Sequence, residues 1–274
     1  MMYLVGTPEQ EARSQRALLD KLEAKFTAAL SAEIASASEA MVDGLIRSGS
    51  VPPLPLDHAS KIAEIYAHIV NLSVLAFGER VVDQGKAVGL VLETKSFAEF
   101  FARLAQEYIA LEAIRRRIVQ VSEATRQQII NAVQIGQQSG QGIPEIAKGI
   151  MDRLPDLTRR RASVIARTET HGAANYGADG AAKSTGLPMR KEWVSVSDAR
   201  TRDFGEGDGV IDAFSHRAMN GVVVDMDQPF MVPSKYLTTE PLMFPGDPNG
   251  SATNVINCRC AIAHIVNFDA ILTR

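Results

Sequence analysis

The stretch PMRKEWVSV, residues 188–196, marks the point at which the chain changes character. From Met189 to Val196 apolar and polar residues alternate, as they do in a half-buried β-strand. Two further apolar, β-branched runs follow at Val222–Met226 and Val255–Val266, separated by loops rich in glycine, aspartate and proline. The sequence therefore predicts an α+β fold. A helical N-terminal half, as a bundle or as extended helices, precedes a small α+β module with a short sheet.

Upstream of residue 188 the sequence has the composition and periodicity of helices. Apolar residues recur at steps of three and four between Leu18 and Leu30, which indicates an amphipathic helix. Ser122 is expected to cap the fourth helix, and Pro155 to end the fifth, because proline removes a backbone hydrogen bond. The predicted helices cover, in order, residues 8–46, 58–84, 97–119, 122–136, 144–153 and 157–186. We expect a mostly helical docking region over 1–155 and the α+β module over 156–274.

Composition limits the classes of protein to which the chain can belong. At 274 residues, 46% of them hydrophobic, it is long enough to bury the core of one large or two modest domains. No run of about 18 uncharged apolar residues occurs, so no membrane span is expected. The N-terminus lacks the basic and apolar regions of a secretory signal. A net charge of −3 argues against nucleic-acid binding over the whole surface.

The middle of the chain is nevertheless basic. Residues 112–161 carry nine cationic side chains against five acidic ones. Solvated helix faces are one interpretation, and weak, sequence-independent contact with DNA or with an acidic partner is the other. The candidate DNA-contacting residues are Arg115, Arg116, Arg117, Arg159, Arg160 and Arg161.

Several polar residues near the predicted strands could carry chemistry. Arg167 and Glu169 lie on the last predicted helix, and we expect them to tie that helix to the module through ion pairs. Asp198 directly follows the first strand, where it can cap the next turn, while Arg202 offers a planar fork for carboxylate or phosphate. A catalytic role for these residues is the alternative interpretation.

The chain has two cysteines, Cys258 and Cys260, which lie on a predicted strand with one residue between them. Alternation would place Cys258, Cys260 and His264 on one strand face. With His216 opposite, these four residues could bind zinc. Buried thiols are common without a metal, so we expect a dry, hydrogen-bonded core, no cofactor and no catalytic residue. Free thiols also suit a reducing compartment.

The order of these motifs resembles that of the phage head morphogenesis proteins, the family of the Mu minor head protein, over about residues 112–266. The shared pattern begins with a helical segment at Val121–Arg126, continues through an Ile-Pro-Glu-Ile-Ala helix and ends on Asn-Cys-Arg-Cys. The residues that carry the resemblance are Arg167, Glu169, Trp193, Asp198, Arg202, His216, Asn220, Gly221, Asn257, Cys258 and Cys260. One departure is the glycine- and aspartate-rich insertion over 203–215, for which we expect a mobile surface loop. No motif is matched in the first 110 or so residues.

The resemblance implies a minor head protein of a tailed phage or phage-like particle. Such a protein acts in head morphogenesis and DNA packaging as a structural, non-enzymatic component of the virion, assembled in the host cytoplasm. The implied partners are the portal protein and the major capsid or scaffold protein, with weak contact to double-stranded DNA as a further expectation. Because the chain ends just after the module, no toxin domain is expected. The alternative is a metal-dependent hydrolase at His216, Cys258 and Cys260, or a transferase using Arg167, Asp198 and Glu169.

Overall fold

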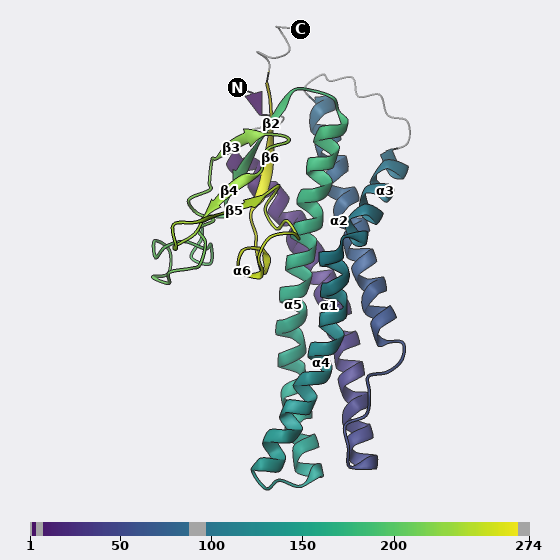
Figure 1. Cartoon of the computed structure of the whole chain (residues 1–274). Coiled ribbons are helices and arrows are strands. Elements are labelled where there is room, and N and C mark those ends of the chain that lie inside the picture. Colours follow the sequence, from purple (N-terminus) through teal and green to yellow (C-terminus); the bar gives the residue numbers. More distant parts are fainter. Residues whose placement is uncertain (1, 4–7, 88–96, 268–274) are drawn as a thin grey trace. The chain divides into compact units, whose positions relative to one another are not determined.

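The computed structural model describes residues 2–3, 8–87 and 97–267 (Figure 1). It confirms an α+β protein with a helical N-terminal half and a small antiparallel sheet in the C-terminal part. The helices are α1 (Pro8–Ser48), α2 (His58–Ala87), α3 (Phe97–Ala110), α4 (Glu112–Gln138), α5 (Ile143–Ser184) and α6 (Ala252–Val255). The strands are β1 (Met2–Tyr3), β2 (Met189–Val194), β3 (Val223–Asp225), β4 (Phe230–Pro233), β5 (Thr239–Leu242) and β6 (Ala261–Val266).

The chain folds into two compact units that are discontinuous in sequence. Unit 1 comprises Met1–Leu22, Ile69–Ile109 and Arg167–Arg274, and unit 2 comprises Glu23–His68 and Ala110–Ala166. Helices α1, α2 and α5 each supply residues to both units. The sequence predicts one boundary between two regions, at residue 155. The two units defined by contacts instead alternate along the chain.

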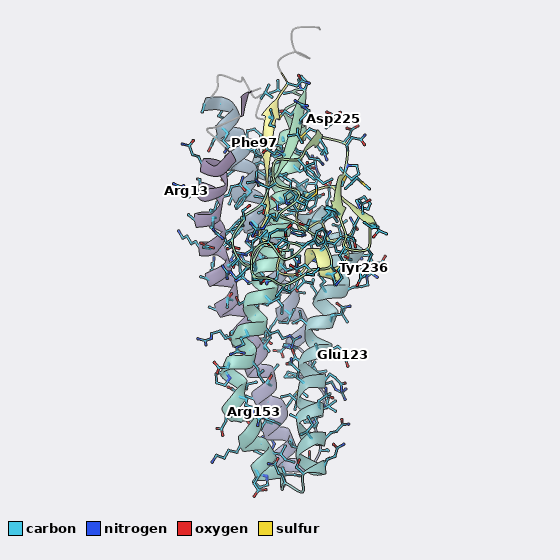
Figure 2. The ribbon with its side chains drawn as sticks, turned by 90° about the vertical axis from the view of Figure 1, so that its left-hand side faces the viewer. Arg13, Phe97, Glu123, Arg153, Asp225 and Tyr236 are labelled. Atoms are coloured by element: carbon cyan, nitrogen blue, oxygen red, sulfur yellow. The ribbon has the colours of Figure 1, made fainter. Side chains whose placement is uncertain are left out.

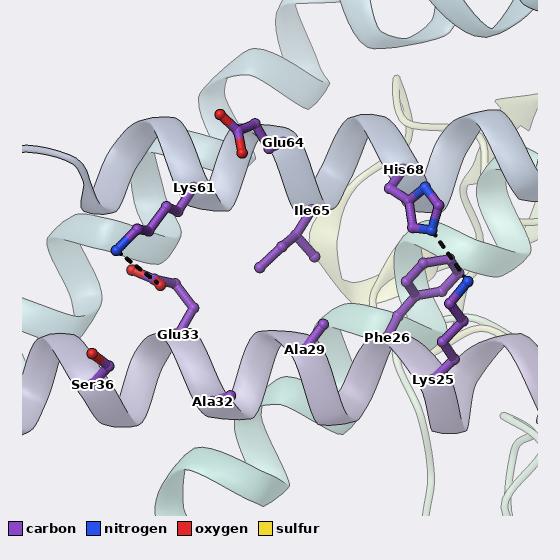
Figure 3. A pocket seen from close by; sticks show the side chains of 10 residues that line it. All are labelled: Lys25, Phe26, Ala29, Ala32, Glu33, Ser36, Lys61, Glu64, Ile65 and His68. Atoms are coloured by element: carbon purple, nitrogen blue, oxygen red, sulfur yellow. Dashed lines mark hydrogen bonds and ion pairs between the residues drawn. The ribbon is translucent and has the colours of Figure 1, made fainter.

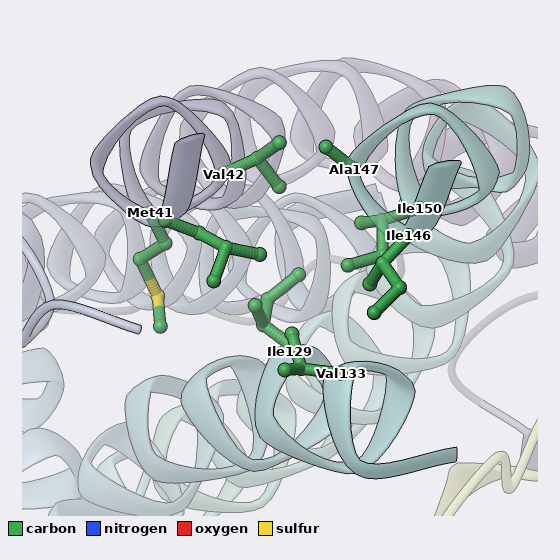
Figure 4. Packing of buried hydrophobic residues seen from close by; sticks show 8 residues of the cluster. Met41, Val42, Ile129, Val133, Ile146, Ala147 and Ile150 are labelled. Atoms are coloured by element: carbon green, nitrogen blue, oxygen red, sulfur yellow. The ribbon is translucent and has the colours of Figure 1, made fainter. Parts of the chain in front are cut away.

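Unit 2 is built from helices that bury their apolar stripes. A cluster in its core joins residues of α1, α4 and α5 (Figure 4). Gly136 allows the end of α4 to approach α5, because a Cβ atom there would lie 2.5 Å from the Ile146 side chain. The buried residues of this cluster are Met41, Val42, Leu45, Ile129, Val133, Ile146, Ala147 and Ile150.

Unit 1 contains a four-stranded antiparallel sheet in the order β1-β6-β2-β3. Strands β2 and β6 pair along their whole lengths, with Trp193 opposite Ile262. Asn175 of α5 fixes one end of β6, since its amide donates to the carbonyls of Pro245 (2.8 Å) and Cys260 (3.0 Å) and accepts from the Ile262 N–H (3.2 Å). Helix α5 thereby positions the residues that directly precede β6.

The remaining strands form a separate hairpin. Strands β4 and β5 pair antiparallel, with Phe230 opposite Leu242. The hairpin follows a turn in which Gly221 adopts a φ of +80°, a conformation that glycine reaches without steric cost. That turn holds β2, because the Gly221 N–H donates to Trp193 and the Asn220 side chain accepts from the Ser195 N–H.

Three predicted helix boundaries are wrong. Helix α5 runs through Pro155 as one 42-residue helix. A proline there costs about 3 kcal/mol, which the burial of Ile150, Leu154 and Ala162 on either side offsets. The helix predicted over 97–119 instead ends at Ala110, and α4 begins after an extended Leu111. Ser122 accordingly lies inside α4 rather than at its N-cap.

Among the described residues, α2 is a helix long and apolar enough to cross a membrane by length and composition. The sequence has no uncharged apolar run of this length and predicts no membrane span. Half of the most apolar window of α2 is buried within the protein, and Ile62, Tyr66 and Val74 are all at most 1% exposed. This burial is typical of a core helix, which is apolar around much of its circumference.

Candidate functional site

The motif residues of unit 1 converge on the segment 254–260, here called the cysteine segment. Helix α5 holds this segment at Asn257, because the Arg167 guanidinium donates to the Asn257 side-chain oxygen and the Thr168 hydroxyl accepts from the Asn257 N–H (2.9 Å). Asn257 has a φ of +64°, which asparagine tolerates better than most residues. Arg167 therefore holds the cysteine segment through the side-chain amide of Asn257.

The loop after β2 holds the cysteine segment from another direction. Asp198 accepts a bidentate pair of hydrogen bonds from Arg259, at 2.8 and 2.5 Å, and caps its own turn by accepting from the Arg200 N–H. The Arg259 guanidinium holds the pKa of Asp198 well below its usual value. Arg202 donates to the Ile256 carbonyl. Since Arg167, Asp198 and Arg202 all bond to this segment, they position it, which favours the structural interpretation over a transferase.

His216 meets both cysteines in the interior of the module. Its Nδ1 lies 3.5 Å from Cys258 Sγ and 3.6 Å from Cys260 Sγ. The three potential ligand atoms all lie within 4.8 Å of one another, and each residue is at most 3% exposed. The fully buried indole of Trp193 packs edge-on against the His216 ring at 5.3 Å between centroids. This arrangement, here called the His–Cys cluster, is formed by His216, Cys258 and Cys260.

The orientation of the His216 ring follows from the hydrogen bonds behind it. The Asn254 amide donates from Nδ2 to Glu240 Oε2 at 2.9 Å, so its carbonyl oxygen is the atom that faces His216 Nε2. A carbonyl oxygen only accepts hydrogen bonds, and Nε2 of His216 is therefore the donor in this contact. Glu240 is itself held as an acceptor by the Ser251 N–H and hydroxyl. His216 thus turns Nδ1 toward the two sulfurs.

The two thiols differ in acidity. The pKa of Cys258 lies well below its usual value, because the Cys260 thiol donates to its sulfur and His216 and Arg202 lie nearby. The pKa of Cys260 is raised because Cys258 accepts its hydrogen bond and because burial disfavours a second charge. Cys258 is therefore the sulfur that becomes a thiolate first.

A small cavity adjoins the His–Cys cluster. Its volume of about 10 Å³ corresponds to the space that one water molecule requires. His216 and Cys260 contribute to one wall, and polar groups of the loop after β2 form much of the rest. The lining residues are Val196, Arg200, Thr201, Arg202, His216, Asn257, Arg259 and Cys260.

The predicted four-residue zinc set is only partly brought together. Cys258 and Cys260 precede β6 in a non-strand segment, whereas His264 lies on β6 opposite Lys191. The three-residue cluster does not include His264. The prediction that all three residues share a strand face is therefore wrong, because strand alternation begins only at Ala261. Glu169, also among the motif residues, is buried on α5 at 2% exposure.

The six candidate arginines of the basic middle lie in unit 2 and have different environments. Four of them are exposed on α4 and α5, namely Arg115, Arg116, Arg159 and Arg160. In Figure 2 the labels Glu123 and Arg153 mark these two helices. Arg161 differs because its guanidinium donates to the Thr125 hydroxyl (2.8 Å) and the Val121 carbonyl (2.5 Å). Partial burial lowers its pKa. Arg161 therefore joins α5 to α4 within the protein.

The insertion over 203–215 has an organised base. Asp203 is 1% exposed and accepts from the Arg217 guanidinium at 2.8 Å. Its backbone N–H donates to the Asp212 carboxylate, and Phe204 forms an isolated bridge with Ile211. The His216 and Arg217 N–H groups both donate to the Arg202 carbonyl. The backbone before and after the insertion is therefore joined by hydrogen bonds, and His216 lies beside the cysteines.

Unit 2 also contains a groove between α1 and α2 (Figure 3), with a volume of about 530 Å³. Lys61 lies 3.9 Å from Glu33 at one end, and Lys25 lies 3.2 Å from His68 at the other. The floor between these pairs is formed by small and apolar side chains, including Ala29. Each of these four charged or polar groups is thus paired across the groove.

Sequence reasoning missed the residues that orient the cluster. Asn254 and Glu240 orient the ring of His216, and Asn175 fixes the start of β6. These residues carry no recognisable spacing relative to the cysteines. The only signal was a buried-looking polar residue on the alanine-rich face of α5, which identifies Asn175 as a residue in need of partners.

With this geometry established, comparison with known proteins identifies the family. Residues 127–263 match the family described as "Phage Mu protein F like protein". The match covers half of the 274 residues, and the chain belongs to this family, as the order of its motifs predicted. The coarse functional class is therefore that of a phage head morphogenesis protein, a virion-related structural family.

The curated relatives add little about activity. The uncharacterized protein YqbB of Bacillus subtilis (strain 168) is 23% identical to the chain over 145 residues. That stretch is 53% of this chain and 42% of YqbB, so the chain spans less than half the length of this relative. No solved structure matches the chain significantly.

The Asp198–Arg259 ion pair is expected to make the free energy of unfolding depend on pH. We expect Asp198→Asn to lower the free energy of unfolding at pH 7 by about 1–2 kcal/mol, because a charge-assisted, bidentate bond is lost at a site that is one-third exposed. The folded-state pKa of Asp198 is depressed, so its contribution is present above the unfolded pKa of about 3.9 and is lost as the pH falls through the folded value. The check is urea unfolding of both proteins at pH 7 and near pH 3.

The control for this experiment is Asp225→Asn, which alters an exposed carboxylate on β3 and should change stability by less than about 0.5 kcal/mol. A wild-type advantage over Asp198→Asn that is equally large at both pH values would contradict the assigned role of the pair.

Proposed function

We propose that this protein is a minor head protein that acts in head morphogenesis at the portal of a tailed phage or phage-like particle. The family match over residues 127–263 is the observation that carries the proposal. The convergence of the motif residues on the cysteine segment supports it, because the contacts of Arg167, Asp198 and Arg202 serve a compact module rather than a reaction site. The proposed partners are the portal protein and the major capsid or scaffold protein.

Deletion of the gene tests this role. The deletion is expected to leave capsid and terminase proteins intact and to yield non-infectious or defective heads, with infectivity restored by the wild-type gene in trans. The protein should also co-purify with heads and cross-link to the portal protein. A normal infectious titre after deletion would rule out the proposal, and absence from purified heads would rule out a lasting place in the virion.

Weak contact with double-stranded DNA is a further part of this proposal. Arg115, Arg116, Arg159 and Arg160 are exposed on α4 and α5 of unit 2. The contacts of Arg161 place residues 159–161 beside residues 121–125 of α4. At a rise of about 1.5 Å per residue, Arg115 and Arg116 lie about 10 Å along the axis of α4 from that contact, a length of duplex that carries several phosphates. The two arginine groups can therefore act on one stretch of phosphates.

Salt dependence tests the DNA contact. Affinity for duplex DNA should fall steeply with salt, since each neutralised phosphate releases counterions. Replacing the four exposed arginines by glutamine should reduce the slope of log affinity against log salt by about 3–4. A charge-matched variant that replaces Arg13, Arg47, Arg103 and Arg153, all exposed, should reduce it by less. Equal slopes for the two variants, or no binding at low salt, would refute the contact.

A further inference from the structure

The His–Cys cluster has the donor set of a transition-metal site. Two sulfurs and one imidazole nitrogen converge in the interior of unit 1, and soft thiolate and imidazole ligands together select zinc or a similar metal. With Zn–S bonds of about 2.3 Å and Zn–N bonds of about 2.0–2.1 Å, a tetrahedral site separates nitrogen from sulfur by about 3.5 Å. The observed separations from His216 Nδ1 are 3.5 and 3.6 Å. Both nitrogen–sulfur distances therefore match those of a tetrahedral zinc site.

Hydrogen bonds outside the cluster prepare the histidine for a metal. Zinc-binding histidines usually donate their other ring N–H to a carboxylate, a carbonyl or a water, which fixes the tautomer. In this protein the side-chain oxygen of Asn254 accepts a hydrogen bond from Nε2, and Glu240 orients Asn254. Nδ1 is accordingly the ring nitrogen that faces the two sulfurs and a metal between them. Two sulfur atoms lie within 3.6 Å of Nδ1, and one cation between the three atoms would be bound by all of them.

Among the residues that the structure describes, three protein ligands come together at this site. His264 is excluded by its place on β6. The fourth tetrahedral position can be filled from the adjoining cavity, whose volume of about 10 Å³ accommodates one water molecule. His216 and Cys260 border both the cluster and this cavity. A three-ligand site with one position open to a small exogenous ligand is the arrangement that results.

We propose that His216, Cys258 and Cys260 bind one Zn²⁺ ion, with a water molecule from the adjoining cavity as its fourth ligand. The ion joins the turn at residue 216 to the cysteine segment. It adds a link at the place where Arg202, Asp198 and Arg167 hold the same segment by hydrogen bonds. The sequence alone favoured a metal-free core, and the orientation of His216 is the feature that reverses this preference.

Metal analysis of the full-length protein tests the site. Protein purified under a non-chelating reductant and incubated with Zn²⁺, then desalted, should retain about one zinc ion per chain. Replacing zinc by Co²⁺ should give the absorption bands of thiolate-bound, tetrahedral cobalt. Cys258→Ser, Cys260→Ser and His216→Asn should each lower the retained metal at least tenfold. His264→Gln is the matched control, since it alters a buried histidine outside the ligand set and should keep the metal.

Two outcomes would overturn the proposal. Folded wild-type protein that retains no zinc and gives no thiolate–cobalt bands binds no metal at this site. Metal retained by a double variant with Cys258→Ser and His216→Asn lies somewhere else. If the single variants do not fold, alkylation of the wild-type thiols decides: a chelator should raise the labelling rate of Cys258 and Cys260 at least tenfold, and an unchanged rate speaks against bound zinc.

Discussion

Replacing Trp193 by alanine is expected to lower the free energy of unfolding by about 3–5 kcal/mol. Trp193 is 0% exposed and is the largest fully buried side chain of the described residues. Its indole packs edge-on against both His216 and Phe230, with ring centroids 5.3 Å apart in each case. The substitution removes these contacts and leaves a cavity between β2, the His216 turn and the β4–β5 hairpin. Chemical denaturation followed by circular dichroism measures the loss.

The size of the expected loss depends on burial, and two further variants test that dependence. Trp193→Phe keeps part of the packing and should cost clearly less than the alanine variant. Tyr236→Ala removes an aromatic ring that is 71% exposed, and should change stability by less than about 0.5 kcal/mol. A loss below about 1 kcal/mol for Trp193→Ala would mean that the module does not close around this residue.

Adding a single methyl group at Gly177 is expected to destabilise unit 1 by about 2–3 kcal/mol. A Cβ atom at this position of α5 would lie 2.7 Å from both the Cα atom and the carbonyl oxygen of Val74 on α2. These are backbone atoms, so the clash is relieved only by moving one helix away from the other, and overpacking of this kind costs about 1–3 kcal/mol. Thermal or urea unfolding of Gly177→Ala against wild type provides the measurement.

Gly149 provides a matched control in the same helix. A Cβ atom at Gly149 meets nothing within 4 Å, so Gly149→Ala should raise stability by about 0.5–1 kcal/mol through helix propensity alone. The two glycine-to-alanine changes are thus expected to have opposite signs. If Gly177→Ala stabilised the protein as Gly149→Ala does, the close approach of α2 and α5 at Val74 would be refuted.

Local patterns predicted the parts of the fold that depend on periodicity. The alternation of residues 189–196 identified β2, and the apolar spacing between Leu18 and Leu30 identified α1. Strands β1, β4 and β5 are two to four residues long, too short for a period of two to be recognised. Pro155 was misjudged for a different reason, because tertiary packing on both sides outweighs a local penalty.

The candidate site was predictable in its residue types but not in its geometry. The spacing of Cys258 and Cys260 indicated a common direction, yet the strand that was expected to provide it begins only at Ala261. The orientation of His216 depends on Asn254 and Glu240, and their contacts bring together residues up to 38 positions apart in the chain. Such contacts follow from tertiary packing, which no spacing along the sequence encodes.

The discontinuous units have a consequence for folding during synthesis. Unit 2 is complete once residue 166 has been made, whereas unit 1 needs both Met1–Leu22 and Arg167–Arg274. At about 5–20 residues per second, a ribosome needs about 5–20 s to add the residues after 166. Strand β1 must wait for its partner β6, since Met2 pairs with Val266. Contacts so distant in sequence form slowly. Strand β1 is therefore synthesised before the other strands but can pair only after β6 has been made.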